Sequence, residues 1–186
     1  MIDQIDLFAA AGAAEAAAGN FDVEAIPTSG SIPIPPGIYS DLDTLTRHCN
    51  NCQRCGLAAG RTNVVVSRGN PQAPIMIVGE GPGQQEDEQG LPFVGKSGQL
   101  LEKILAAVRL DTEQDVYICN VVKCRPPNNR TPVADETAAC KGYLLEQIRL
   151  IDPKIILLTG ATAMKGLTGE KRGITKIRGQ WIEWEG

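Results

Sequence analysis

Basic residues are absent from residues 1–40, and histidine and aromatic residues are scarce throughout the chain. The sequence has one histidine, and aromatic residues make up 4% of it. Five of the 22 acidic residues lie in residues 1–40, so the rest of the chain carries 18 basic and 17 acidic residues. A body so close to neutral cannot attract nucleic acid by its bulk charge, and such contact requires a local basic patch.

Long apolar runs and a basic leader are also missing. No stretch approaches the roughly 18 consecutive apolar residues that indicate a membrane-spanning helix. The alanine-rich start lacks the positive charge of a secretory signal. We therefore expect a cytoplasmic protein with no membrane partner. In that reducing compartment, six cysteines favour metal or cluster ligation over disulfides.

The composition of the chain changes near residue 38. Residues 1–38 are rich in Ala and Gly and then in Pro and Ser, which predicts a low-complexity, disordered tail. Leu7 and Phe8 could start a short helix that docks a partner protein, with a solvated tail as the alternative. Residues 39–186 suffice for one domain, which we expect to be monomeric. Its end, residues 173–184, alternates apolar and polar residues and predicts a hairpin.

Strand and helix patterns alternate along this domain. Three short runs predict strands, at residues 75–78, 116–122 and 155–159, and the first is fully apolar, as in a strand buried on both faces of a parallel sheet. After the first run, Ser97 can cap a helix with apolar residues at helical spacing as far as Val108. Pro132 and Asp135 open a second helix that reaches about Ile151. This order predicts a single α/β domain with three α/β/α layers around a mainly parallel sheet.

Four cysteines form a frame that joins distant parts of the chain. Cys52 and Cys55 are a close pair, whereas Cys124 and Cys140 stand alone near the middle. A metal or cluster bound by such a set would pin the N-terminal segment onto the domain. Cys119 lies inside a predicted strand, which indicates packing.

Two glycine-containing runs follow the first predicted strand. Residues 79–87 read GEGPGQQED and lie where parallel sheets bind ligands, although Gly81-Pro82-Gly83 does not fit the dinucleotide fingerprint. Residues 90–97, GLPFVGKS, match the phosphate-binding loop G-x-x-x-x-G-K-S. That loop should follow its strand directly and should not contain a proline among its phosphate-binding amides. We therefore do not expect nucleotide hydrolysis.

Taken together, these motifs resemble the family 4 uracil-DNA glycosylases, the iron-sulfur members of their superfamily. The resemblance covers about residues 45–184 and rests on an ordered set of segments. They are CQRCGL at 52–57, RTNVV at 61–65, GEGPGQQED at 79–87, LPFVG at 91–95, VYICNVVKCRPPNNRTP at 116–132, Cys140, and LTGATA at 158–163.

The resemblance implies a 4Fe-4S cluster held by four cysteines. These are Cys52, Cys55, Cys124 and Cys140. Cys49 repeats the spacing of the close pair, so a ligand swap stays open, and zinc is an alternative because it also accepts four thiolates.

The resemblance also implies that uracil is flipped out of DNA into a pocket at the strand ends. Phe93 would stack on the base, and Asn120 would pair with the uracil edge. The implied catalytic residues are Glu80, Gly81 and Glu86, and the further substrate-binding residues are Gly83 and Asp87. The implied phosphate contacts are Lys123, Arg125 and Arg130. From the residues alone, Phe93 could be a core anchor, Asn120 a turn residue, Glu86 and Asp87 caps, and the basic residues a solvated loop.

The chain departs from the family in one respect. Family members carry a later His-Pro-Ser segment, which supplies a catalytic histidine, whereas the one histidine here is His48. We therefore expect a C-terminally incomplete domain with an exposed sheet edge and weak or no excision. A non-catalytic iron-sulfur or zinc module that binds nucleic acid is the alternative.

Overall fold

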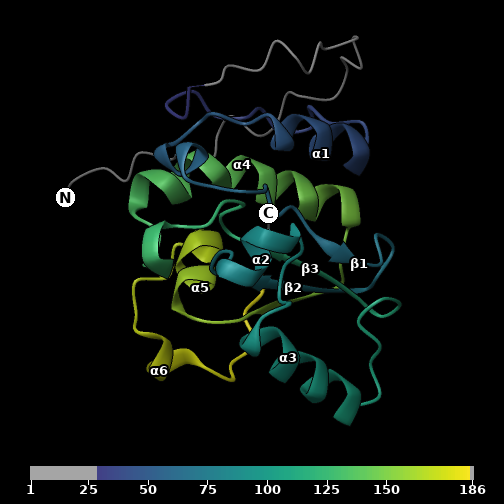
Figure 1. Ribbon diagram of the computed structural model, residues 1–186. Coiled ribbons are helices and arrows are strands. Elements are labelled where there is room, and N and C mark those ends of the chain that lie inside the picture. The colour runs from purple at the N-terminus through teal and green to yellow at the C-terminus, as the bar shows by residue number, and fades with distance from the viewer. Residues whose placement is uncertain (1–28, 185–186) are drawn as a thin grey trace, which may run out of the picture.

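The computed structural model describes residues 29–184 and contains one sheet surrounded by helices (Figure 1). The strands are β1 (Arg68–Gly69), β2 (Ile75–Gly79), β3 (Val116–Asn120) and β4 (Ile155–Leu158). The α-helices are α1 (Leu42–Asn50), α2 (Gln84–Gln89), α3 (Lys96–Ala107), α4 (Ala134–Ile151), α5 (Ala161–Thr168) and α6 (Ile174–Ile177). Two short 3₁₀ helices are η2 (Gly56–Ala59) and η3 (Pro127–Asn129).

The sheet is mainly parallel, as the sequence predicts. Its strand order is β1-β3-β2-β4, in which β2 pairs in parallel with both β3 and β4 while β1 is antiparallel to β3. The register pairs Ile75 with Val116 and Gly79 with Asn120. The carboxyl ends of β2 and β3 therefore meet, at the edge where parallel sheets bind their ligands.

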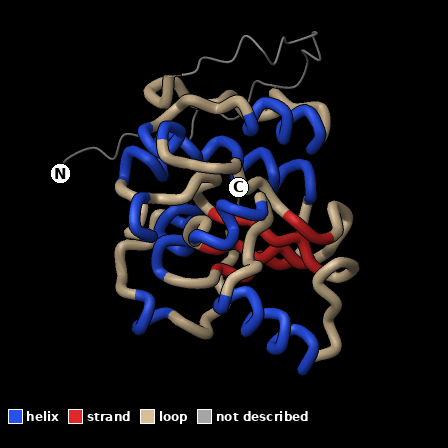
Figure 2. The backbone as a smooth tube through the Cα atoms, in the orientation of Figure 1, coloured by secondary structure: helices blue, strands red, loops and turns tan. Residues whose placement is uncertain are grey.

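Helices cover both faces of the sheet and confirm the three α/β/α layers (Figure 2). On one face, Met76 and Tyr117 pack in one core with residues of α4 and α5. On the other face, Ile77 and Ile118 pack with residues of α3. Helix α1 lies outside α4 and closes a smaller core that contains Tyr143 (Figure 1). The thiol-bearing start of the domain is therefore stacked on α4.

The packed domain begins inside the segment expected to be a tail. Ile34 is buried in the small core, and a Cβ atom on Gly142 of α4 would lie 2.6 Å from the Ile34 Cβ atom. Because residue 142 has no side chain, the segment around Ile34 can lie directly against α4. The docking helix expected near Leu7 and Phe8 falls outside the described residues.

The C-terminal hairpin prediction was wrong. Within the described part of residues 173–184 the structure has the short helix α6 and no strand. Ile174 and Ile177 are three residues apart, which also places them on one side of a helical turn. Trp181 is 85% exposed, so the alternation did not mark a buried sheet face.

Strand β4 is one edge of the sheet. Ile155 and Leu157 are exposed there, beside a cavity of about 680 Å³ that α6 and Trp184 also line. None of the helices between residues 29 and 184 is both long and apolar enough to cross a membrane.

Candidate active site and candidate metal centre

A cavity of about 480 Å³ opens at the carboxyl ends of β2 and β3. Its walls come from the loop after β2, the loop before α3, the start of α3 and the segment after β3. The lining residues are Gly79, Glu80, Gly81, Pro82, Gly83, Glu86, Phe93, Ser97, Leu100, Leu101, Ile104, Asn120, Pro126, Asn129, Arg130 and Thr159. Most of the residues that the sequence singled out as substrate contacts therefore face one space.

Phe93 and Asn120 meet over the end of β2. A Cβ atom on Gly79 would lie 2.4 Å from the Asn120 Oδ1 atom and 2.5 Å from the Phe93 Cζ atom. Both distances are too short for a real side chain, so glycine at position 79 is what lets the amide and the ring approach the backbone. Asn120 is only 2% exposed, and it lines the cavity.

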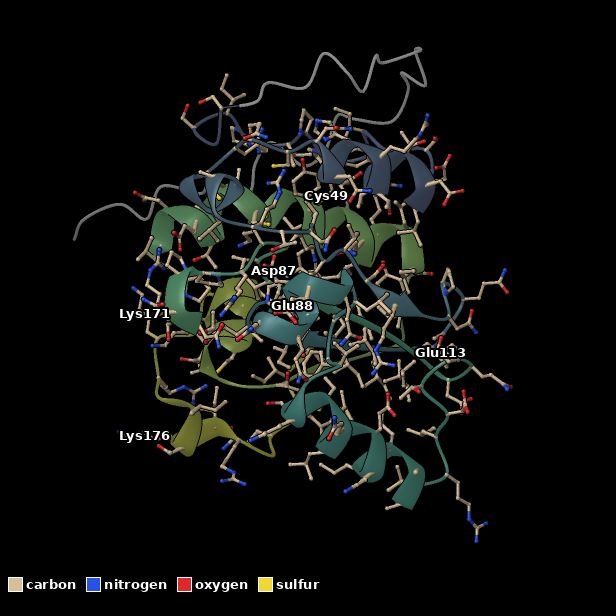
Figure 3. All side chains as sticks on the ribbon, viewed as in Figure 1. Cys49, Asp87, Glu88, Glu113, Lys171 and Lys176 are labelled. Atoms are coloured by element: carbon tan, nitrogen blue, oxygen red, sulfur yellow. The ribbon has the colours of Figure 1, made fainter. Side chains whose placement is uncertain are left out.

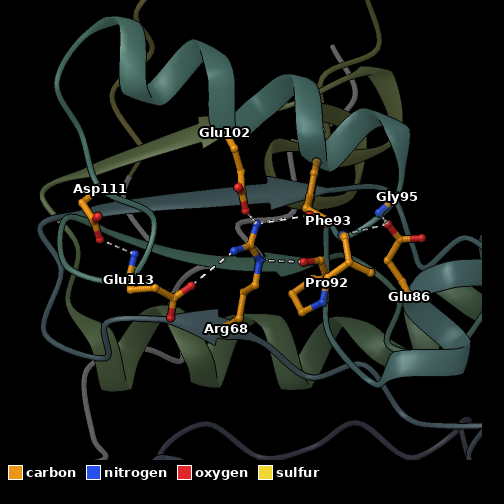
Figure 4. Close-up of polar contacts among 9 residues, drawn as sticks. Arg68, Glu86, Pro92, Phe93, Gly95, Glu102, Asp111 and Glu113 are labelled. Atoms are coloured by element: carbon orange, nitrogen blue, oxygen red, sulfur yellow. Dashed lines mark hydrogen bonds and ion pairs between the residues drawn. The ribbon is translucent and has the colours of Figure 1, made fainter.

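The loop that carries Phe93 is held from two sides (Figure 4). Arg68 of β1 donates to the carbonyl oxygens of Pro92 and Phe93, at 2.8 and 3.1 Å. Glu86 of α2 accepts from the amides of Val94 and Gly95, at 3.0 and 2.7 Å. Phe93 has a φ of 56°, a left-handed conformation that costs a non-glycine residue roughly 1 to 3 kcal/mol. The surrounding hydrogen bonds fix this strained residue in place.

The same contacts explain why the phosphate-loop match is not a nucleotide site. Glu86 binds the amides of Val94 and Gly95, which a phosphate would need to contact. Helix α3 consequently begins at Lys96 after the N-cap residue Gly95, and the predicted Ser97 cap was wrong. The internal carboxylate already takes the place of an anion at this helix end.

Glu80 and Gly81 lie on the cavity wall directly after β2. The Glu80 carboxylate accepts a hydrogen bond from the hydroxyl of Thr162 in α5. The Glu80 carbonyl accepts from the amide of Val122 at 3.2 Å, and a Cβ atom on Gly81 would lie 2.7 Å from a Val122 methyl group. The loop is thus locked against the segment after β3. Thr162 was missed as a partner, although it lies in one of the segments that carry the family resemblance.

The substrate-binding assignment of Asp87 needs correction. Asp87 is buried on α2 and does not line the cavity (Figure 3). Its carboxylate accepts from the amides of Thr62 and Asn63, at 2.9 and 3.3 Å, which ties α2 to the chain after the cysteine loop. Gly83 does line the cavity, and its amide donates to Glu86 at 3.1 Å.

The phosphate-contact assignment of Lys123 was also wrong. Lys123 is 1% exposed, and its ammonium donates to the Asn120 carbonyl at 2.6 Å and to the Gln147 side-chain oxygen. A buried amine engaged in this way cannot reach a DNA phosphate. Lys123 instead holds the backbone of Asn120, the residue whose side-chain amide lines the cavity.

Arg125 and Arg130 remain accessible near the cavity. Arg125 donates to the Asn129 side chain at 2.8 Å. Exposed Arg130 lines the cavity and forms a two-pronged pair with Glu136, at 2.6 and 2.9 Å. Hydrogen bonding in this pair raises the pKa of Arg130 and lowers that of Glu136. These two side chains form a small basic rim.

Five thiols surround one pocket between α1, α4 and the segment after β3. They belong to Cys49, Cys52, Cys55, Cys124 and Cys140. The structure therefore brings together the four predicted ligands and also the neighbouring thiol of Cys49, which is buried on α1 (Figure 3). Cys119 is buried in β3 and lies in the main core. The choice among five thiols stays open, as it does in the sequence.

Burial makes four of these thiols, those of Cys49, Cys55, Cys124 and Cys140, poor anions on their own. It raises the pKa of Cys124 to about 11 and that of Cys140 to about 12, and it raises the pKa of Cys49 as well. Arg61 approaches the Cys124 sulfur at 3.5 Å and moderates the shift there. A bound cation that displaces the thiol protons would satisfy such a site.

The chemistry of the side chains bears on which group the pocket fits. The five cysteines offer only thiols, which suit an iron-sulfur cluster and also suit tetrahedral zinc. Across residues 29–184, no group of three His, Cys, Asp or Glu side chains is arranged to hold a single metal ion.

Comparison with known proteins identifies the family. Residues 66–185 match the model of the uracil DNA glycosylase superfamily. The type-4 uracil-DNA glycosylase of Thermotoga maritima is 50% identical over 146 residues, which cover 78% of this chain and 76% of the relative. The type-4 enzyme of Sulfurisphaera tokodaii is 46% identical over 149 residues, covering 77% of this chain and 67% of the relative.

A type-5 relative is more distant. The type-5 uracil-DNA glycosylase of Pyrobaculum aerophilum is 28% identical over 162 residues, which cover 72% of this chain and 70% of the relative. These matches confirm the resemblance that the motifs carry. The chain therefore belongs to the uracil DNA glycosylase superfamily and, within it, to the type-4 uracil-DNA glycosylases.

Proposed function

We propose that this protein is a DNA-repair glycosylase that takes uracil out of the DNA stack and hydrolyses its N-glycosidic bond. The observation that carries the proposal is the buried amide of Asn120 beside the Phe93 ring in the wall of a preformed cavity. The relatives are named for this activity, which supports the same reading. Uracil-containing DNA is the partner that it requires.

Asn120 supplies base recognition in this proposal. An amide offers one acceptor and one donor side, so it can accept from uracil N3–H and donate to uracil O4. Cytosine presents the opposite pattern at these positions and would leave the buried amide unpaired. Lys123 holds the backbone of Asn120 from inside, and the missing side chain at Gly79 leaves room for the Asn120 amide and the Phe93 ring.

Phe93 supplies the stacking surface. The flipped base loses its neighbours in the duplex, and an aromatic ring replaces part of that stacking. The ring must be rigid to be useful, because a misplacement of about 1 Å can cost a factor of about 100 in rate. Arg68 and Glu86 provide that rigidity from opposite sides of the loop.

Glu80 is the carboxylate placed to assist bond cleavage. It lies at the β2 end of the cavity and is oriented by Thr162. As the glycosidic bond breaks, positive charge develops on the sugar, and a fixed carboxylate nearby stabilises that charge and can orient the attacking water. Glu86 has both oxygens occupied by backbone amides, so its contribution is to hold the loop in position.

The basic rim positions the nucleic acid. Arg125 and Arg130 are accessible near the cavity, and phosphate contacts of this kind fix orientation without reading sequence. Arg130 already pairs with Glu136, so a phosphate would share or replace that carboxylate. We expect binding that weakens markedly with added salt.

A 4Fe-4S cluster is the cofactor that the thiol pocket fits, with Cys52, Cys55, Cys124 and Cys140 as its ligands. Thiolates held on one cluster would cross-link the loop after α1 to α4 and to the chain after β3. This places the cofactor in a structural role, apart from the cavity. The cytoplasmic location and the monomeric state expected from the sequence stay predictions.

Weak excision also stays a prediction, and one observation favours the non-catalytic alternative. The histidine of the sequence, His48, lies on α1 beside the thiol pocket, so no imidazole borders the cavity. A missing donor of this kind typically costs about 100- to 1,000-fold in rate. DNA binding without turnover is therefore the outcome to distinguish from catalysis.

The test measures free uracil and DNA binding in parallel. Oligonucleotides with one uracil, single-stranded and double-stranded, are incubated with the protein, and released uracil is quantified by mass spectrometry. We expect Asn120→Asp to lower the release rate by about 100- to 1,000-fold, because it replaces the buried amide. Asn70→Asp makes the same chemical change away from the cavity and should leave the rate unchanged. Tight binding without release favours the non-catalytic module, and neither binding nor release would refute the proposal.

A further inference from the structure

Among the described residues, three basic side chains and no carboxylate line the thiol pocket. The basic residues are Arg54, Arg61 and Lys123. Arg54 and Lys123 direct hydrogen bonds to oxygen atoms, whereas Arg61 also donates to a sulfur. Arg61 does not line the strand-end cavity, so the uracil chemistry proposed there does not account for it.

Arg61 joins two segments that carry cysteines. Its Nη1 atom donates to the backbone carbonyl of Cys52 at 2.7 Å and to the sulfur of Cys124 at 3.5 Å. Its Nη2 atom donates to the carbonyl of Asn50, the last residue of α1, at 3.4 Å. Cys52 belongs to the loop after α1, and Cys124 follows β3. One guanidinium therefore bonds to two segments that lie far apart in the sequence.

The backbone that follows Arg61 is fixed in place. The amides of the next two residues donate to the carboxylate of Asp87, which is buried on α2. The amide of Val65 donates at 2.8 Å to the carbonyl of Lys123, the residue before Cys124. The side chain of Arg61 therefore starts from a backbone that is attached to the segment carrying the Cys124 sulfur.

A guanidinium suits this position for two reasons. It stays charged at every pH at which the protein is folded, so its contact with the sulfur requires no change of protonation. Its planar fork of N–H groups can donate to a carbonyl and to a sulfur at the same time. A hydrogen bond from a cation to a thiolate is stronger than one between neutral groups. The contact should therefore strengthen when Cys124 binds a metal as a thiolate.

We propose that Arg61 is a positioning residue for the iron-sulfur cluster, because its guanidinium donates to the Cys124 sulfur and to the Cys52 carbonyl and so holds two ligand-bearing segments together. The inference rests on the proposed 4Fe-4S cofactor and adds a residue outside its ligand set. A cation that donates to a cluster sulfur stabilises the more negative, reduced form and raises the reduction potential. Residues that orient metal ligands typically contribute about 10- to 100-fold to metal affinity.

The experiment compares the full chain with Arg61→Gln, Arg61→Lys and the control Arg47→Gln, all purified without oxygen. Arg47 is an exposed arginine on α1, and its side chain donates to the Thr44 hydroxyl at 3.3 Å. Iron and acid-labile sulfide are counted first. Spectroelectrochemical titration then gives the reduction potential, and the loss of cluster absorbance in the presence of a chelator gives the rate of iron release.

The two readings have different physical causes. Arg61→Gln should move the reduction potential to a more negative value and release iron about 10- to 100-fold faster, whereas Arg47→Gln should match the wild type in both. A loop that is merely loosened would admit water, which stabilises the reduced form and moves the potential in the opposite direction. The sign of the potential shift therefore separates the contact with the sulfur from a general loss of structure.

Arg61→Lys separates the charge from the fork. Lysine keeps the positive charge but lacks the planar set of donors. Its potential should therefore shift less than that of Arg61→Gln, while iron release should stay faster than in the wild type. If Arg61→Gln does not fold, Arg61→Lys decides the matter, because wild-type potential and wild-type iron release in this variant would overturn the inference.

Each failure has its own signature. A wild-type protein that contains no iron or sulfide overturns the cofactor proposal and this inference with it. A full cluster in the wild type, with unchanged potential and unchanged iron release in Arg61→Gln, overturns this inference alone. Equal changes in Arg61→Gln and Arg47→Gln would also overturn it, since they would show a general effect of losing a positive charge near α1.

Discussion

The strand-end cavity and the thiol pocket differ in how far their polar groups are already paired within the protein. The cavity is complete without a ligand, because backbone and charged side chains already pair around Phe93, Glu80 and Asn120. The thiol pocket gathers five cysteines, and burial raises the pKa of four of them, Cys49, Cys55, Cys124 and Cys140, which disfavours their thiolates in the absence of a cation. In the proposed function, the first site is preorganised for a flipped base, and the second depends on a bound cluster.

Because the two sites differ in this way, substitutions in them should have different consequences. Loss of a support around the cavity should reduce catalysis while the domain stays folded. Loss of the thiol group should loosen the chain before β1, because α1 and the cysteine loop are attached mainly through α4. Loss of the cluster is the change that should separate the two regions most.

Removal of the cluster should have the largest effect on stability. A group bound only by the native state, at about a thousandfold excess over its Kd, contributes about 4 kcal/mol. Cys124→Ser, or chelation of iron from the wild type, should therefore lower Tm by roughly 8 to 16 °C for a chain of this size. Iron and acid-labile sulfide analysis together with calorimetry measures both quantities.

Cys119→Ser is the matched control for that change. Cys119 is buried in β3 but does not line the thiol pocket. The control should keep its iron and sulfide while losing some packing stability. If Cys124→Ser kept a full cluster, Cys49 would be the replacement ligand to test next, as a Cys49→Ser and Cys124→Ser double variant.

Lys123→Met should weaken both regions, because Lys123 lies between them. Its ammonium bonds to Asn120 and Gln147, and its side chain also lines the thiol pocket. Hydrogen bonds to a charged group contribute about 1.5 to 3 kcal/mol each, and the buried acceptors would be left unpaired. We expect a loss of about 3 kcal/mol in the free energy of unfolding, with reduced uracil release.

Exposed Lys103 on α3 provides the control, as Lys103→Met. Urea unfolding followed by circular dichroism gives the stability of both variants, and the uracil assay gives the rates. A Lys123→Met protein with wild-type stability and wild-type uracil release would show that the two regions are independent at this residue.

The sequence predicted the sheet well because its strands are continuous apolar runs. Both 75–78 and the start of 116–122 became strands buried on both faces. The second run ends as a strand at Asn120, since the amides of Val121 and Val122 bond to Gly79 and Glu80 across the cavity rim. Hydrophobicity alone could not show which carbonyl groups these two amides would bond to.

The sequence predicted the composition of the sites better than the direction of their side chains. Thiols have few structural alternatives, and the four predicted cysteines do lie around one pocket, together with Cys49. Lys123 and Asp87 have polar groups that suit a surface or a core equally well when the core offers partners. Gln147 and the amides of Thr62 and Asn63 are such partners, and they lie far away in sequence.

Arg68→Met should affect the cavity alone. It removes two hydrogen bonds to the Phe93 loop, together with ion pairs to Glu102 and Glu113 (Figure 4). A loop released from its strained position misplaces the Phe93 ring, so uracil release should fall roughly 10- to 100-fold. Iron content should stay at the wild-type level, which distinguishes this variant from the preceding ones.

Glu113→Gln tests whether the ion pairs matter in that result. Glu113 is exposed, and its pair with Arg68 spans 3.3 Å, so its removal should cost less than about 1 kcal/mol and leave uracil release unchanged. Equal losses of activity in Glu113→Gln and Arg68→Met would mean that charge, and not support of the loop, is the important feature.

Acid should weaken the thiol side of the molecule through the cap of α1. Hydrogen bonds from the Thr44 amide, and then from the Ser40 hydroxyl, lower the pKa of Asp41 to about 2. Because the pKa is lower in the folded state than in the unfolded state, the cap stabilises α1 above about pH 4 and loses its effect as the pH falls towards 2. We expect a small decrease in the urea midpoint across this window.

Asp41→Asn isolates the titration, because asparagine also caps helices but does not ionise. That variant should have a shallower pH dependence of the urea midpoint than the wild type, whereas Asp43→Asn on the same exposed turn should keep the wild-type slope. Uracil release at neutral pH should be equal in all three proteins, since α1 lies on the far side of α4 from the sheet. A change in uracil release without a change in slope would show that α1 and the cavity are coupled, and the separation of the two regions would then be wrong.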